Sequence, residues 1–387
     1  MKKIGNSFKG ILGGLIALLI GICLLWWNEG NNVKNLKTTA EMEKIVIDIK
    51  SDSVDSNNEG KLVATNGKLI NEEELTDENF GVTVKTPILK RIVEVYQWEE
   101  DSHTNDNDVT TYTYDKKWSS DLIDSSNFHN AGHNNPAQKL YDDKTFTSSN
   151  VKLNAFTLSN DQVNNLSTKE KFINFNQEKI NSLNLTVSNN YITNSKDLNN
   201  PEIGDERISF VYNNSTDISV LAVQTGNTFT SYVSSTGKTV SRIMDGTHSG
   251  AEMIENIKKE NNFLKWMFRF IGILLLVIGF GSILGPISAI SSFVPILGNI
   301  VGTAVGLVSF LLGLSLGLVI IAIAWIRFRP LLGIGLLAIA IGLIYLIIKK
   351  GKQETKSDSM QPNSDINKAE QSTENIEQPS QNQDNNQ

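Results

Sequence analysis

The chain of 387 residues has a single cysteine, Cys23, which lies in a long apolar run near the N-terminus. One cysteine excludes an intrachain disulfide and a cysteine-based metal cluster. We interpret Cys23 as a small apolar packing residue. Acidic residues outnumber basic ones, because 42 Asp and Glu stand against 35 Lys and Arg and give a net charge of -7. This balance argues against nucleic-acid binding, which usually needs a basic surface.

Charge is absent from four long apolar runs, within which no Asp, Glu, Lys, Arg or His occurs. The runs are Ile11–Trp27, Phe270–Ile290, Leu297–Ile326 and Leu331–Ile348. A run of roughly 18 or more uncharged residues is long enough to cross a bilayer as a helix. The pattern predicts four transmembrane helices, one N-terminal and three C-terminal. Helices without ionisable groups anchor and pack, and they are poorly suited to transport.

Basic residues at both ends of the chain predict that both termini are cytoplasmic. The polar region between the first and second spans is then exoplasmic or lumenal, although basic residues before the second span and at Arg327 and Arg329 oppose this orientation. The tail is rich in Gln, Asn, Ser and acidic residues and is predicted to be disordered. The predicted divisions are a basic N-terminus at 1–10, a signal-anchor helix at 11–27, an α+β domain at 28–265, a three-helix region at 266–348 and a cytoplasmic tail at 349–387.

Small residues recur every fourth position in two parts of the third apolar run, at Gly298, Gly302 and Gly306 and again at Gly313 and Gly317. This spacing lets two helix backbones approach closely. It fits either association between copies of the chain or packing within its own bundle, and the second is favoured. Pro286 and Pro295 each remove a backbone donor, so the residues between them are predicted to form a tight turn or an interfacial segment.

The polar region mixes predicted helices and strands. Residues 33–43 and 252–265 show helical patterns next to the spans, and 161–176 is a third helix candidate. A strand is expected at 45–49, and a long hairpin is expected from 93–98 and 110–114, with Tyr96, Trp98, Tyr112 and Tyr114 forming cross-strand pairs. Short alternating segments predict a meander over 208–212, 218–223 and 228–233.

Residues that could carry chemistry form no complete motif. The acidic segments 99–101 and 106–108 lack the Gly and distal Glu of a calcium loop. His129 and His133 are four apart, but Gly132 and Pro136 disfavour the helix that zinc binding would need. A hydrolase triad from Ser119, Ser120, Asp121, Asp124 and His133 lacks a nucleophile elbow. We therefore expect no enzyme activity, cofactor or metal site.

Several motifs resemble the transmembrane protein 43 (LUMA) family. They occur in order between about residues 27 and 330, whereas 141–200 and the tail do not share the pattern. They are Trp27-Asn-Glu-Gly30 with Val33-Lys34, 58–63, 80–82, Tyr96-Gln-Trp98, Tyr112-Thr-Tyr114 with Trp118, 127–128 with Gly132-His-Asn-Asn-Pro136, Pro201-Glu-Ile-Gly-Asp205 with 207–210, and Arg329-Pro330.

The resemblance implies a non-enzymatic scaffold that self-associates and whose domain faces the lumen or the exterior. It implies no catalytic residues. In a eukaryote the expected compartment is the endoplasmic reticulum or inner nuclear membrane, and in a prokaryote it is the cytoplasmic membrane. Gly132-His133 and Gly204-Asp205 are expected to form turns. The motif positions taken as structural are Asn28, Glu29, Gly30, Tyr96, Trp98, Trp118, His133, Pro136, Gly204, Asp205 and Arg207.

The leading functional hypothesis is a scaffold that recruits other membrane proteins through 28–265 and associates with further copies through its helices. The expected partners are the lipid bilayer, a second copy and membrane proteins of unknown identity, and no nucleic acid. The alternative is an exoplasmic ligand sensor that signals through the juxtamembrane helices at 34–43 or 252–266. Transport and hydrolysis are less favoured.

Overall fold

The computed structural model describes residues 2–104, 109–291 and 295–331. Within these ranges three helices contain segments long and apolar enough to cross a membrane. They are α1 (Lys2–Ile45), α4 (Gly250–Ser291) and α5 (Pro295–Phe328). The first three predicted spans lie in these helices. The predicted fourth span, apart from Leu331, and the tail at 349–387 lie outside the described residues.

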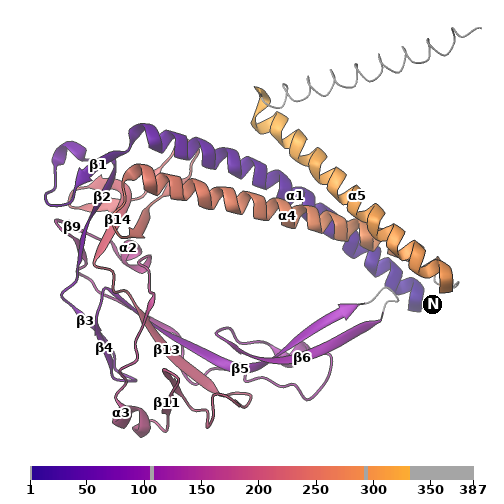
Figure 1. Ribbon diagram of the computed structural model, residues 1–387, viewed down its shortest axis with the longest axis horizontal. Coiled ribbons are helices and arrows are strands. Elements are labelled where there is room, and N and C mark those ends of the chain that lie inside the picture. The colour runs from indigo at the N-terminus through magenta and orange to yellow at the C-terminus, as the bar shows by residue number, and fades with distance from the viewer. Residues whose placement is uncertain (1, 105–108, 292–294, 332–387) are drawn as a thin grey trace, which may run out of the picture. The chain divides into compact units, whose positions relative to one another are not determined.

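Helices α1 and α4 pack side by side and antiparallel, as Figure 1 shows. A methyl group added at Gly14 would lie 2.7 Å from the carbonyl oxygen of Gly279. Much further along, Asn35 Nδ2 donates to Asn261 Oδ1 at 2.8 Å. Residues 28–45 of α1 and 250–265 of α4 lie beyond the apolar spans, and we call them the stalk. At 1.5 Å per residue the α1 part of the stalk extends about 27 Å.

Helix α5 packs on the membrane part of α4 through glycines. A methyl group at Gly313 would lie 2.7 Å from the backbone nitrogen of Val277, and one at Gly317 would meet Ile273. A methyl group at Gly306 would have no neighbour within 4 Å among the described residues outside its own helix. Gly298 and Gly302 belong to α5, but their surroundings lie outside the description.

The predicted break at Pro286 is wrong. Helix α4 continues through this proline to Ser291. A proline removes only one backbone donor, and the rest of the helical hydrogen-bond ladder can persist, as it often does in membrane helices. Residues 292–294 are outside the described part of the chain.

The region between α1 and α4 is β-rich and contains two larger sheets. The first sheet has the order β15-β14-β2-β8-β9, with β1 parallel to β2 and β18 on β14. Its strands are β1 (Ile47–Lys50), β2 (Leu62–Ile70), β8 (Lys152–Leu153), β9 (Phe156–Thr157), β14 (Asp217–Thr225), β15 (Thr228–Thr230) and β18 (Arg242–Asp245).

The second sheet is antiparallel, with the order β11-β12-β13-β5-β6, and β7 and β10 pair at its sides. Its strands are β5 (Ile88–Thr104), β6 (Thr110–Ser119), β7 (Lys144–Thr147), β10 (Glu170–Lys171), β11 (Thr186–Ser188), β12 (Tyr191–Thr193) and β13 (Glu206–Tyr212). Figure 1 shows β5 and β6 extending as a two-stranded arm beyond the other strands.

Smaller elements complete the region. They are the strand pairs β3 (Glu74–Asp77) with β4 (Val82–Lys85) and β16 (Tyr232–Val233) with β17 (Thr239–Val240), the 3-10 turns η1 (Ser56–Asn58) and η2 (Ser125–Asn127), and the short helices α2 (Asn160–Asn164) and α3 (Gln177–Ser182).

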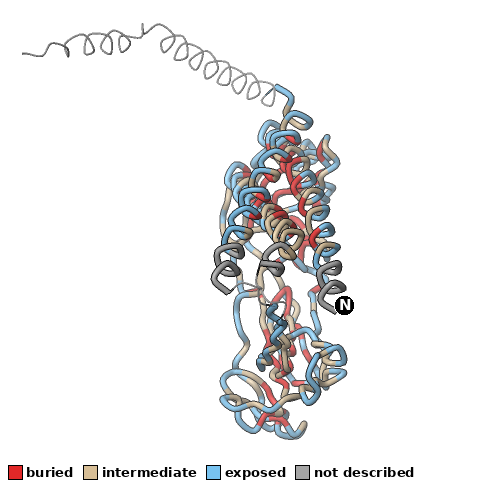
Figure 2. The backbone as a smooth tube through the Cα atoms, turned by 90° about the vertical axis from the view of Figure 1, so that its right-hand side faces the viewer, coloured by how far each residue is buried: buried red, intermediate tan, exposed pale blue. Residues whose placement is uncertain are grey.

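The first sheet is buried on both faces. Alternate side chains of its strands point to opposite sides, and each side packs against other residues. Val63 and Val220 face an inner core with Phe156, whereas Leu62 and Leu221 pack against the stalk. The stalk contributes Met42, Met253 and Ile254 to this contact. In Figure 2 the buried positions follow both the packed helices and the strands. The domain therefore rests on the stalk through apolar side chains.

Polar contacts fasten the same junction. The Tyr232 hydroxyl donates to the Glu41 carboxylate on α1, which also accepts the backbone N–H and hydroxyl of Ser235. Burial and the neighbouring Glu41 raise the pKa of Tyr232 to about 12, so the phenol keeps its proton and stays a donor.

Two further local predictions need correction. The helix expected at 161–176 ends at Asn164, because Asn165 caps it and the backbone N–H of Phe172 bonds to Phe210 in the second sheet. The expected meander is split, since β13 and β14 belong to different sheets. The strands expected at 208–212 and 218–223 are nevertheless present.

The hairpin exists, but its aromatic pairing differs from the prediction. The register places Tyr96 opposite Trp118, Trp98 opposite Lys116, and Tyr114 opposite Glu100. Strand β6 continues to Ser119, further than predicted, and this brings Trp118 rather than a tyrosine opposite Tyr96.

Candidate functional site

The motif residues form two clusters, the first of which lies where α1 and α4 leave their apolar spans. Glu29 Oε1 and Arg269 Nε are 2.6 Å apart, and the side chains are 1 % and 10 % exposed. Placing charges in such a site is costly unless they are paired and hydrogen-bonded. The ion pair therefore joins α1 to α4 at the end of the membrane segment.

Neighbouring residues surround this pair. Asn28 Nδ2 donates to the carbonyl of Lys265 at 3.1 Å, and the Arg269 guanidinium lies 4.8 Å from the ring centre of Trp266. Trp27 contacts Phe268 edge to face. Exposed Trp side chains next to Lys and Arg are typical of the headgroup level of a bilayer. We call Asn28, Glu29, Lys265, Trp266 and Arg269 the membrane-boundary cluster, and Gly30 follows it half-buried in α1.

The second cluster lies on the second sheet, where β6, β5 and β13 run side by side. The rings of Tyr96 and Trp118 are 5.2 Å apart. Arg207 lies over Trp118 at 4.7 Å and binds Glu94 with two hydrogen bonds of 2.7 and 2.9 Å. Such a planar, bidentate contact holds the guanidinium flat against the aromatic ring.

The Gly204-Asp205 turn extends this sheet. The backbone N–H of Gly204 donates to the carbonyl of Tyr96, whose own N–H donates to the carbonyl of Asp205. Gly204 has a φ of +95°, which favours glycine. Asp205 Oδ2 accepts the N–H of Glu202, and a methyl group at Gly204 would lie 3.5 Å from Pro136. Gly204, Asp205 and Pro136 thus fix backbone geometry.

The two histidines hold a loop against the arm. His133 stacks on Tyr114 at 3.7 Å and meets Trp98 edge to face at 4.7 Å. His129 stacks on Tyr112 at 4.0 Å. The described residues contain no group of His, Cys, Asp or Glu suited to a metal ion. The cation site considered at 99–101 and 106–108 lies partly outside the described residues.

The hydrolase candidates do not meet in a catalytic geometry. The Ser119 hydroxyl donates to the carbonyl of Asp121, and Asp124 caps η2. His133 Nδ1 lies 3.4 Å from the carbonyl of Asn130 and not beside a serine hydroxyl. The side chains in these contacts serve local structure.

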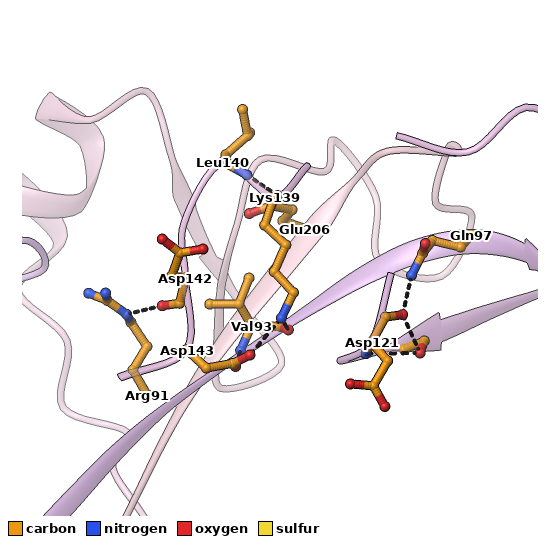
Figure 3. A network of polar contacts seen from close by, with 10 residues as sticks. Arg91, Val93, Gln97, Asp121, Lys139, Leu140, Asp142, Asp143 and Glu206 are labelled. Carbon is orange, nitrogen blue, oxygen red and sulfur yellow. Dashed lines mark hydrogen bonds and ion pairs between the residues drawn. The ribbon is translucent and has the colours of Figure 1, made fainter. Parts of the chain in front are cut away.

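The sequence did not predict one partly buried polar network. Figure 3 shows Glu206, Lys139 and Asp143 drawn together around Leu140 and Val93. Glu206 Oε1 accepts the N–H of Leu140 at 2.5 Å, and Lys139 Nζ donates to Asp143 at 2.6 Å and to the carbonyl of Val93. Burial raises the pKa of Glu206. The network binds the 139–143 segment to β5 and β13.

Arg91 fastens the other end of this segment. Its Nε donates to the carbonyl of Asp142 at 2.8 Å, and its Nη1 is 2.7 Å from Asp77. Both side chains of this ion pair are at most 5 % exposed. No spacing rule joins Arg91, Lys139 and Glu206, because they meet only through strand pairing. Of the residues that were not predicted, Arg269 has a sequence signal, because it is the last charge before the second span, as Glu29 is the first charge after the first span.

Comparison with known proteins gives a consistent result. A family model described as Transmembrane protein 43 matches residues 95–330. Transmembrane protein 43 of Pongo abelii is 27 % identical, over 92 % of this chain and 93 % of its own length. The homologue of Drosophila melanogaster is 28 % identical, over 84 % and 90 %. No solved structure matches the chain significantly.

Proposed function

The chain belongs to the transmembrane protein 43 family of membrane proteins, and we propose that it is a non-enzymatic scaffold that holds partner proteins at a fixed position near the membrane. The observation that carries this proposal is the attachment of the β-rich domain at both of its ends to one antiparallel helix pair. Apolar contacts and the Glu41 contacts join the domain to that pair, and the membrane-boundary cluster joins its two helices to each other. A domain held in this way is suited to positioning other proteins.

The arm offers a surface for recruitment. Strand β6 has β5 on one side, and the described residues place no strand on its other side. Peptides commonly bind by adding a strand to such an edge. We propose that membrane-protein partners dock on the arm formed by β5 and β6.

Association between copies would use the free part of α5. Gly313 and Gly317 contact α4 of the same chain, whereas the described residues leave open space beside Gly306. Small residues that face lipid allow two helices to approach closely. We propose that copies meet on the Gly306 side.

The scaffold role is tested by crosslinking the full-length chain in its native membrane and recovering complexes in mild detergent. We expect stable complexes larger than a monomer. The variant Gly306→Leu should reduce contacts between copies, and Gly285→Leu, in α4, is the matched control. Recovery of monomer alone, with no crosslinked neighbour, would contradict the proposal.

We propose that the domain faces the exoplasmic or lumenal side. Single cysteines at Ser125 and Ser372, in a Cys23→Ser background, report this in intact cells. Labelling of Ser125→Cys alone from that side supports the proposal. Labelling of Ser372→Cys alone would make the domain a cytoplasmic platform.

A ligand sensor is the second candidate, favoured by a hollow of about 260 Å³ at the junction of domain and stalk. Thr38 of α1, Glu260 of α4 and Arg242 of β18 are among its lining residues. A ligand bound to the domain could act on both stalk helices through this junction. Binding to the folded state would raise the unfolding temperature of the full chain.

A further inference from the structure

A larger hollow, of about 590 Å³, lies on the domain between α2 and the chain that runs from β15 to β18. Its volume falls within the range of about 300–1,000 Å³ that is usual for small-molecule sites. It is lined by Ser159, Asp161, Gln162, Asn164, Asn165, Phe229, Thr230, Ser231, Thr239 and Ser241.

The lining is polar and carries little charge. Asp161 is its single ionisable group, and eight other residues carry a hydroxyl or an amide. Without Lys or Arg, the hollow is poorly suited to phosphates and carboxylates. Phe229 is the one large apolar residue, and it is 2 % exposed and stacked on Phe156, so an apolar ligand would find little to contact.

Several of these polar groups are available to a ligand. The side chains of Asp161, Asn164, Ser231 and Ser241 are exposed, and within the described residues they form no hydrogen bond. In contrast, Asn165 donates to the carbonyl of Asp161 and Thr230 bonds to Thr225. The free set combines donors with acceptors, because a hydroxyl or an amide supplies both and a carboxylate accepts.

We propose that this hollow binds a short neutral oligosaccharide. Sugar hydroxyls are themselves donors and acceptors, so they match a wall of Ser, Thr, Asn and Asp and require no cation. This role goes beyond the scaffold function and does not depend on it. Thr239 and Ser241 also line the hollow at the stalk junction, so a bound sugar would touch the segment that separates the two hollows.

The test uses the full-length chain in nanodiscs and saturation-transfer NMR. The probes are maltotriose, mannotriose, galactotriose and triacetylchitotriose, each titrated to about 10 mM. Trigalacturonic acid, which is anionic, is the control ligand. Ser231→Trp and Ser241→Trp each place a large side chain in the hollow, and Ser53→Trp, at an exposed position that does not line the hollow, is the matched control. The unfolding temperature of each variant shows whether it folds.

We expect at least one neutral trisaccharide to bind saturably and trigalacturonic acid not to bind. Ser231→Trp and Ser241→Trp should each weaken binding by at least about tenfold, while Ser53→Trp leaves it unchanged. Two variants are used so that a misfolded one does not decide the outcome. Absence of binding by all four neutral probes overturns the proposal, as does binding that survives in a folded Trp variant. Neither result bears on the crosslinked complexes that test the scaffold role.

Discussion

The membrane half and the stalk half of the α1–α4 pair join the same two helices in different ways. Within the apolar spans, glycines let the backbones approach, as at Gly14 with Gly279 and at Gly272 with Leu25. Along the stalk, the contacts are polar, as in Asn35 with Asn261 and Lys258 with Glu43 at 2.5 Å. In the bilayer there is no hydrophobic driving force between helices, because lipid tails are as apolar as the side chains. Close packing must therefore hold the two helices together there. In the stalk, which lies outside the apolar spans, polar contacts and the apolar contact with the β-rich domain hold the two helices together.

The membrane-boundary cluster separates the two halves, and breaking it should have the largest effect. Arg269→Leu leaves the buried Glu29 without its cation, which typically destabilises a protein by about 3–5 kcal/mol. Unfolding in mixed detergent micelles measures this loss. The double variant Glu29→Leu with Arg269→Leu should recover most of it. If the double variant is as unstable as the single one, the pair does not join the helices electrostatically.

Introducing a larger side chain at a packed glycine should destabilise the membrane half of the α1–α4 pair. Gly14→Leu would push a side chain into the backbone of α4, at a cost of about 1–3 kcal/mol. A methyl group at the neighbouring Gly13 would have no described neighbour within 4 Å outside its own helix. Gly13→Leu is therefore a matched control that should be close to neutral. The same unfolding assay compares them. Equal effects would show that Gly14 does not face α4.

A smaller effect is expected in the stalk. Asn35→Ala removes one side-chain hydrogen bond to Asn261, which usually contributes about 0.5–1.5 kcal/mol. Lys37→Ala, on an exposed position of the same helix, is the control. A loss as large as that of Arg269→Leu would mean that the stalk, rather than the boundary, holds the pair together.

The pH dependence of the second sheet should leave the helix pair unaffected. The pKa of Glu206 is raised in the folded domain. A raised pKa means that the folded state binds the proton more tightly, so its contribution to stability is present at acid pH and is lost as pH rises through the folded pKa. Glu206→Gln should therefore be more stable than the wild type at neutral pH, and the difference should shrink on acidification.

The sequence predicted the parts of this structure that depend on local patterns. Three apolar runs correspond to membrane helices, and residues 33–43 and 252–265 are helical because their apolar positions recur at helical spacing. The hairpin also followed from alternation. The helix at 161–176 failed because tertiary hydrogen bonding of Phe172 to the second sheet overrides the local pattern.

The candidate sites were predicted less completely. Glu29 and Arg207 were identified through the family resemblance, but their partners Arg269 and Glu94 lie far away in the chain. The Glu206 network depends on which strands are neighbours, and no spacing in the sequence encodes that. The hollow that we propose binds a sugar has the same origin, since α2 and β15 meet only in the folded domain.

One continuous helix pair, α1 with α4, runs from the membrane to the domain. Its most direct test is disulfide formation between Asn35→Cys and Asn261→Cys in native membranes, in a Cys23→Ser background. We expect rapid crosslinking of this pair and little crosslinking of Lys37→Cys with Asn261→Cys, because Lys37 lies on another side of α1. Absence of the first crosslink, or equal crosslinking of both pairs, would contradict it.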